Sequence, residues 1–242
     1  MRSARPRALV ILLLAIVAGA AVAGAFLARE PKAPPPRAAA QRPVLLLLTS
    51  LPLVFGEDFS LRGGGSPALK ALETRYRVVP ISVADPKELA KGRLLLMAHP
   101  LAQPAEDLVA LDDWVRAGGR VMLLADPMLE WPSKRPLGDA LRPPPMFMDT
   151  GLLAHWGLRL EAPDRRGPER EELSGFEVAT VSPGELTGGC RIGAGGLVAR
   201  CSIGKGEATV IADADLLDIP DLGSAGRHNM DAILTELGRL EQ

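Results

Sequence analysis

The segment from Leu94 to Pro127 constrains the fold more than any other part of the chain. It contains two short, unbroken apolar runs, Leu94–Ala98 and Val121–Ala125, on either side of an amphipathic segment. A strand with one face in water alternates apolar and polar residues, so these uninterrupted runs predict strands buried on both faces, as in a parallel sheet. The segment therefore predicts two parallel strands joined by a helix, a right-handed βαβ crossover.

The amphipathic segment between the two runs has the pattern of a surface helix. Leu108, Leu111 and Val115 fall on one helical stripe, and charged residues occupy most of the opposite face. Pro104 suits the first helical turn, where the missing amide is no loss. Gly118 can adopt the left-handed conformation that ends a helix, so the helix is expected to stop there.

The rest of the chain predicts further strands and helices of the same kind. We expect strands at Val44–Thr49, Arg77–Val83, Leu158–Leu160 and Phe176–Val181. We expect helices at Ala68–Tyr76, Asp85–Ala90, Thr150–Trp156 and Asn229–Leu240. Irregular loops are expected from Asp126 to Pro145 and from Pro163 to Ser174, and a glycine-turned hairpin over Gly189–Ile211. The predicted fold class is α/β: a three-layer sandwich with a mostly parallel sheet plus an antiparallel hairpin.

Composition and charge limit the composition of the core and the classes of partner that the chain can bind. Hydrophobic residues make up 47% of the chain but aromatic residues only 4%, so the core must consist of leucine, valine and alanine. The formal net charge is −1, yet residues 1–42 carry seven basic residues and one acidic residue. The remainder therefore has a charge of −7 and lacks the positive field that nucleic acid requires, so no nucleic-acid partner is expected.

The first 29 residues have the pattern of a transmembrane helix. Three arginines precede an uncharged apolar run, Ala8–Ala28, which is long enough to cross a bilayer. Because arginines stay in the cytoplasm, this pattern predicts a single-pass inner-membrane anchor with the C-terminal domain in the periplasm. A cleaved signal peptide is the alternative, since Ala21-Val22-Ala23 resembles a cleavage site. Residues 30–42 would form a proline-rich linker and residues 43–242 the periplasmic domain.

Cys190 and Cys201 lie symmetrically about Gly195-Gly196. If these glycines form the centre of a turn, the two cysteines face each other on neighbouring strands, close enough for a disulfide. An exported domain permits such a bond. A shift in register would separate them, and two free thiols are the alternative.

Motifs for catalysis are few. The glycine-rich segments near residues 193 and 204 precede strands rather than helices, so they do not form a phosphate-binding loop. No nucleophile elbow of the G-x-S-x-G or G-x-C-x-G type occurs. No catalytic residue, bound cofactor or metal site is therefore predicted.

Polar residues nevertheless follow several predicted strands, where α/β folds place functional groups. His99 follows one strand, Asp126 another, and Asp213 and Asp215 a third, with His228 further along the chain. These five residues form a tentative functional cluster that could hold a cation or a water molecule. The simpler interpretation is that Asp213 and Asp215 cap the turn after their strand.

Three segments together resemble a known family. The crossover "LxxLDDWVRAGGRVMLLADP", the following GLLAHWGLRLEAPD and the tail GKGEATVIADADLLD…HNMDAILTEL are similar to the auxiliary domain of gliding-motility-type ABC transport systems. The resemblance covers roughly Val44–Leu237. It implies a fold like that of class I glutamine amidotransferases without the catalytic cysteine. This chain departs from the family in being short and in having no C-terminal transmembrane helix.

Two functions follow as hypotheses. The resemblance implies a non-enzymatic, membrane-anchored periplasmic subunit that binds an ABC transporter permease, its ATPase or another envelope protein. The contact surface would be the loops around Ser50–Asp58, His99–Gln103 and Asp126–Lys134. The alternative is an envelope hydrolase or a ligand-binding domain that uses Asp213, Asp215 and His228, which requires these side chains to converge in one pocket.

Overall fold

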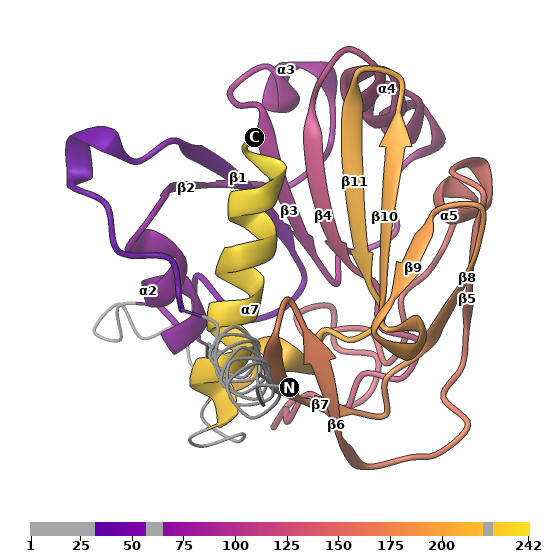
Figure 1. Ribbon diagram of the computed structural model, residues 1–242. Coiled ribbons are helices and arrows are strands. Elements are labelled where there is room, and N and C mark those ends of the chain that lie inside the picture. Colours follow the sequence, from indigo (N-terminus) through magenta and orange to yellow (C-terminus); the bar gives the residue numbers. More distant parts are fainter. Residues whose placement is uncertain (1–31, 57–64, 220–224) are drawn as a thin grey trace, which may run out of the picture. The chain divides into compact units, whose positions relative to one another are not determined.

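A seven-stranded sheet forms the centre of the protein in the computed structural model, which describes residues 32–56, 65–219 and 225–242. The strand order is β2-β1-β3-β4-β11-β10-β9 (Figure 1). The first five of these strands run parallel, and β10 and β9 extend the sheet in antiparallel fashion. The bounds are β1 Val44–Thr49, β2 Arg77–Ile81, β3 Leu94–Ala98, β4 Arg120–Leu124, β9 Arg191–Gly193, β10 Val198–Ile203 and β11 Gly206–Ile211. The prediction of an α/β fold with a mostly parallel sheet is confirmed.

The central strands are buried on both faces, as their apolar runs predict. Alternate residues of β1 and β3 point to opposite sides, so Leu45 and Leu96 join one core while Leu46 and Leu95 join the other. Both cores are built mainly from leucine, valine and alanine, in line with the scarcity of aromatic residues. Burial of these side chains is the dominant stabilising contribution to the fold.

Helices cover both faces of this sheet. The helices α2 (Pro67–Glu73) and α7 (Ala225–Leu240) supply side chains to one core, and α4 (Ala105–Arg116) and α5 (Leu152–His155) to the other. Figure 1 shows α7 crossing one face of the sheet. The short helix α3 (Pro86–Leu89) also packs beside α4. The described residues also contain three single-turn 3₁₀ helices: η1 Ala39–Gln41, η2 Ala194–Gly196 and η3 Asp215–Leu217.

The predicted crossover is present as β3, α4 and β4. Pro104 precedes the first helical residue, and Gly118 takes a left-handed conformation (φ 116°) directly after the helix. The next residue, Gly119, packs against Trp114 so closely that a Cβ would overlap the indole ring. These two glycines therefore allow the chain to turn from α4 into β4 within a few residues.

Two small antiparallel ribbons flank the sheet. One pairs β5 (Leu158–Glu161) with β8 (Glu185–Gly188), and the other pairs β6 (Pro168–Leu173) with β7 (Phe176–Val181). The prediction of a loop over residues 163–174 is therefore wrong in its second half, and β8 was not predicted. The six residues of β6 are mostly charged because one face is exposed and the ribbon has only two strands.

Cys190 and Cys201 form a disulfide, with their Cα atoms 4.8 Å apart. The pairing between β9 and β10 places Arg191 opposite Arg200, and the cysteines are the next pair in the same register. The bond therefore ties the short edge strand β9 and the turn before it to β10.

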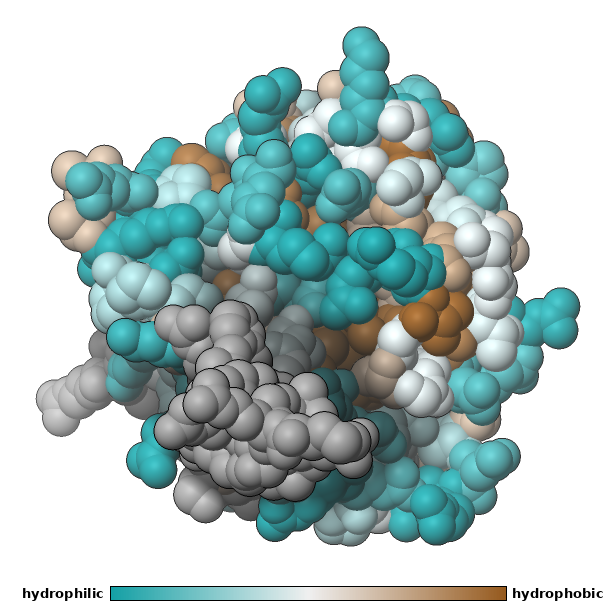
Figure 2. All heavy atoms as spheres, viewed as in Figure 1, coloured by the Kyte–Doolittle hydropathy of each residue, from teal (hydrophilic) through white to brown (hydrophobic). Residues whose placement is uncertain are grey.

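The face shown in Figure 2 is largely hydrophilic, with hydrophobic side chains in small patches. Between residues 32 and 242, apart from the segments 57–64 and 220–224, the protein has no helix of sufficient length and hydrophobicity to cross a bilayer. The predicted anchor, residues 1–29, lies outside the described residues. Residues 33–42, part of the predicted linker, contact the domain, where the Arg37 guanidinium lies 2.7 Å from the Glu241 carboxylate.

Candidate functional site

Three of the five tentative site residues converge at the carboxyl ends of two neighbouring strands. Asp126 follows β4, and Asp213 and Asp215 follow β11, which pairs with β4 in parallel. One carboxylate oxygen of each lies within 4.8 Å of the others. Asp126 and Asp213 are fully buried and Asp215 is 3% exposed. Parallel strands end at the same edge of a sheet, which is why residues distant in sequence meet there.

Backbone amides surround these carboxylates. Their donors lie in three segments, which are the loop after β4, the end of β7 and the turn after β11. Asp126 accepts from Met128 and Ala214, Asp213 from Val181 and Leu216, and Asp215 from Glu130, all at 2.8–2.9 Å. The cluster thus connects these three segments. Its hydrogen bonds to backbone amides have the pattern of carboxylates that cap turns.

Burial sets the protonation of this cluster. Burial raises the pKa of Asp126 to about 6 and that of Asp215 to about 7. The hydrogen bonds from backbone amides lower both pKa values, but by less than burial raises them. Burial and repulsion by Asp126 and Asp215 raise the pKa of Asp213 well above its ordinary value. Three carboxylates this close cannot all ionise without cost, so the cluster retains protons near neutral pH.

The cluster contains the ligand type that divalent cations such as Ca²⁺ and Mg²⁺ prefer. Both oxygens of Asp126 and of Asp213 already accept backbone hydrogen bonds, however. The observed geometry is accounted for by turn capping, the simpler of the two interpretations of the sequence.

His99 occupies a strained position directly after β3. Its φ is 45°, an uncommon value for a residue other than glycine, and its side chain is fully buried. The ring Nε2 lies 2.9 Å from the Pro144 carbonyl, while Nδ1 has no partner among the residues described. Burial lowers the pKa of His99, so the neutral ring donates from Nε2 and connects β3 to the loop after β4.

His228 does not join the acidic residues in any interaction found in the described structure. It is an exposed residue of α7, and its ring centroid lies 6.5 Å from that of Phe176. The convergence of Asp213, Asp215 and His228 that a hydrolase site would require is therefore not observed. The neighbouring Asn229 is buried and bonds both the amide and the carbonyl of Ala179.

Two buried carboxylates on helices were not singled out in the sequence. Asp112 of α4 accepts from the Trp156 indole (2.9 Å) and from Arg116 (2.6 Å), and also lies 3.2 Å from the His155 ring. Glu236 of α7 is fully buried and binds Arg200, Arg239 and Ser174. Both occur in charged helical patterns typical of solvent-facing residues, so neighbouring elements rather than local sequence determine their burial.

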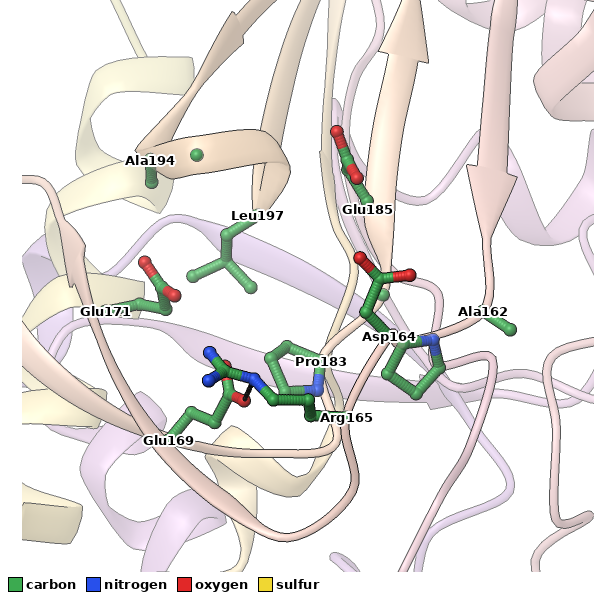
Figure 3. Close-up of a pocket in the computed structure, with 12 residues that line it drawn as sticks. Ala162, Asp164, Arg165, Glu169, Glu171, Pro183, Glu185, Ala194 and Leu197 are labelled. Atoms are coloured by element: carbon green, nitrogen blue, oxygen red, sulfur yellow. Dashed lines mark ion pairs between the residues drawn. The ribbon is translucent and has the colours of Figure 1, made fainter.

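An acidic pocket of about 360 Å³ lies among the two ribbons and η2 (Figure 3). Asp164, Glu169, Glu171 and Glu185 line it together with Arg165, whose guanidinium lies 3.4 Å from Glu169. Figure 3 shows the Arg165 and Glu169 side chains side by side. Exposed carboxylates of this kind are common on protein surfaces, and they do not identify a ligand.

A less polar pocket of about 330 Å³ lies at the carboxyl ends of β1 and β2. Its walls are mostly apolar, and Arg135 is the one charged residue among the lining residues that the structure describes. The lining residues are Leu47, Thr49, Ser50, Leu51, Pro52, Val54, Phe55, Gly56, Pro80, Ile81, Arg135 and Leu141. The hydroxyls of Thr49 and Ser50 donate to the carbonyls of Ala98 and His99, so this pocket borders the end of β3 as well.

Exposed hydrophobic side chains concentrate at the same end of the sheet. Of seven large hydrophobic residues exposed in the described structure, six lie on the loops after β1, β3 and β4; the seventh, Val109, is on α4. The six are Phe55, Leu101, Leu137, Leu141, Met146 and Met148. Phe55 and Leu141, which are 62% and 54% exposed, also line the pocket. Contiguous exposed apolar surface, rather than single exposed residues, marks binding sites, and Phe55 and Leu141 are the two of these residues that share one pocket.

Comparison with known proteins gives no family. No family model matches the chain, and no curated protein matches its sequence. Solved structures with partial similarity include an exo-β-1,4-mannosidase from Opitutaceae bacterium strain TAV5, at 13% identity and a TM-score of 0.49 over 82% of this chain and 36% of that one. The GH42 β-galactosidase Gan42B of G. stearothermophilus has 12% identity and a TM-score of 0.46, over 83% and 30% of the respective chains.

A third similar structure is that of the cytoplasmic protein STM3548 from Salmonella typhimurium, with 10% identity and a TM-score of 0.49. The similarity extends over 82% of this chain and 98% of the chain of STM3548. This chain spans only about a third of the two glycosidases. Similarity at this level does not transfer an activity, a substrate or a compartment.

These findings correct the family resemblance and the predictions that followed from it. None of the three proteins is described as part of a gliding-motility or ABC transport system. The predictions of a non-enzymatic auxiliary subunit, a permease or ATPase partner and a single-pass inner-membrane location find no support in these comparisons and are withdrawn together with the resemblance. The motifs did not identify a family, because many unrelated α/β proteins share the order of strand, helix, double glycine and strand.

Proposed function

We propose that this chain is a ligand-binding domain whose site is the pocket at the carboxyl ends of β1 and β2. The observation that carries the proposal is the position of that pocket in the sheet. The order β2-β1-β3-β4-β11 reverses direction between β1 and β3, and open α/β sheets bind ligands outside the carboxyl ends of the strands at such a reversal. The residues after β1 both line the pocket and contact the end of β3.

The same topology supports the finer assignment of the fold. We infer a doubly wound sheet similar to that of the glutamine amidotransferase class, a fold that the family resemblance had implied. The sheet is open, with β2 and β9 at its two edges, which distinguishes it from a closed barrel.

The pocket has the composition of a small-molecule site. Such sites have mostly apolar walls with a few placed polar groups and volumes of about 300–1,000 Å³. This pocket lies at the small end of that range, at about 330 Å³, and combines apolar walls with Thr49, Ser50 and Arg135. A ligand-binding role thus has better support than hydrolysis, because the acidic cluster is buried and bonded to backbone. The pocket differs from the site of the sequence-based alternative, which used Asp213, Asp215 and His228.

Filling the pocket tests this proposal. A Cβ added at Gly56 meets no atom within 4 Å and the residue's φ is not left-handed, so Gly56→Trp places an indole at the pocket without backbone strain. Gly189→Trp is the matched control, since Gly189 has the same open surroundings but does not line the pocket. The probe is anilinonaphthalene sulfonate, an anion with an apolar aromatic body that becomes fluorescent when bound in an apolar site.

We expect saturable binding with one site in the wild type and in Gly189→Trp, and a loss of affinity of about tenfold or more in Gly56→Trp. Circular dichroism and thermal unfolding establish that both variants are folded. Equal affinity in the two tryptophan variants, or no saturable binding by the wild type, contradicts the proposal.

A further inference from the structure

We propose that the groove between α3 and α4 is a docking surface for a basic amphipathic helix of another protein. The groove is separate from the proposed ligand pocket, with which it shares no lining residue. The inference therefore goes beyond the proposed function and does not depend on it. It rests on the apolar side chains of the groove, on two carboxylates without partners and on the spacing between them.

The groove combines buried and exposed apolar side chains. It has a volume of about 480 Å³ and lies where α3 packs against α4. Leu89 of α3 is buried, Val109 of α4 is 63% exposed, and the Trp114 indole is half-buried and packs against Gly119. An exposed apolar side chain beside an apolar groove is the arrangement into which a helix packs its apolar face.

Two carboxylates give the groove its charge. Glu106 and Asp113 of α4 line it and are exposed, and neither side chain has an ion pair or a hydrogen bond in the part of the chain that the structure describes. Among the described residues, no basic side chain lines the groove. Glu106 lies in the first turn of α4 and complements the helix dipole, but Asp113 lies in the last turn, where the dipole disfavours a carboxylate. Helix stability therefore does not account for Asp113, whereas contact with a basic partner does.

The spacing of the two carboxylates favours a helical partner. Asp113 follows Glu106 by two turns of α4, which is about 10 Å along the helix axis. Val109 and Ala110 lie between them on the same face. A second helix laid along α4 presents two basic residues seven positions apart at the same spacing, with apolar residues between them. Residues three positions apart in an extended chain span about the same distance, but their side chains point to opposite faces.

Fluorescence anisotropy with labelled peptides tests the inference. The probe is an alanine-based helix of about 16 residues, with two lysines seven positions apart and two leucines between them on the same face. The control peptides carry glutamate in place of both lysines, or a central proline that breaks the helix. We expect the basic helix to bind the wild type at one saturable site, and both control peptides to bind at least about tenfold more weakly.

Three variants locate the site on the protein. The double variant Glu106→Gln, Asp113→Asn should bind the basic helix about fivefold more weakly, because two exposed ion pairs are lost. The control double variant, Asp164→Asn, Glu172→Gln, removes the same two charges at exposed positions that do not line the groove, and should bind as the wild type. Val109→Ala, which favours the helix and removes only apolar contact, should weaken binding about threefold. Circular dichroism establishes that all three variants are folded.

Absence of binding to the wild type overturns the inference, as does equal affinity for the basic and the charge-reversed helix or in the two double variants. Wild-type affinity in Val109→Ala overturns it too, because binding would then be attraction by net charge alone. Equal affinity for the proline-containing peptide assigns the groove to an extended partner instead. Light scattering tests a second copy of this chain as the occupant: a dimer that Val109→Ala dissociates overturns the inference. None of these variants changes a residue of the ligand pocket, so the proposed function stands or falls separately.

Discussion

At the scale of single residues, buried carboxylates organise the carboxyl end of the sheet. Asp126, Asp213 and Asp215 were predictable as a group, because each directly follows a strand and parallel strands end together. Their role was harder to predict, since capping a turn and binding a cation use the same residue type. The described residues show no interaction between His228 and this group, since nearness in sequence does not determine which face of a helix a side chain occupies.

The protonation of this cluster predicts how stability depends on pH. Folding raises the pKa values of these carboxyl groups, so their stabilising contribution is fully present below the unfolded pKa of about 4 and is lost as the pH rises through the folded values. Asp215→Asn removes one titrating group and can still accept the hydrogen bond from Glu130. Between about pH 5.5 and pH 7.5 the wild type should lose about 1–2 kcal/mol of unfolding free energy relative to this variant.

Urea denaturation at both pH values measures this difference. Asp112, Glu236 and His99 are common to both proteins, so their titration cancels. Asp164→Asn, at an exposed carboxyl of the acidic pocket, is the matched control for an Asp-to-Asn change outside the cluster. A difference between Asp215→Asn and the wild type that does not change with pH contradicts the predicted shift.

At the scale of elements, the sequence was most informative where burial is complete. The runs that form β1, β3 and β4 are apolar throughout, and their pattern predicts double-sided burial directly. The ribbon strands β6 and β8 are short, charged and exposed on one side, so their sequences resemble loops. Pairing with a distant segment, rather than local preference, makes them strands.

The disulfide that joins Cys190, in the turn before β9, to Cys201 of β10 gives a prediction at this scale. The cysteines are 11 residues apart, and closing a loop of this size stabilises a protein by about 2–3 kcal/mol through the unfolded state. The double variant Cys190→Ala, Cys201→Ala should lose this amount in urea denaturation. Adding a reductant should lower the stability of the wild type toward that of the variant and leave the variant unchanged. Equal stabilities without reductant would show that the bond contributes nothing.

At the scale of the whole molecule, the fold class was predictable and the site was not. The predicted crossover is sufficient to specify a parallel α/β sheet. The reversal of strand order between β1 and β3 is the feature on which the proposed ligand site rests. The pocket itself combines residues from the loop after β1, the end of β2 and the long loop after β4. No local pattern in the sequence indicates that Ser50, Ile81 and Arg135 line one space.

The central claim is that this pocket binds a ligand, and nuclear magnetic resonance mapping of anilinonaphthalene sulfonate onto the wild-type protein tests it most directly. We predict saturable chemical-shift changes concentrated in Thr49–Gly56, Pro80–Ile81 and the segment from Arg135 to Leu141. Changes that concentrate instead around the acidic pocket at Glu171 and Glu185, or that spread over the surface without saturating, would contradict the account.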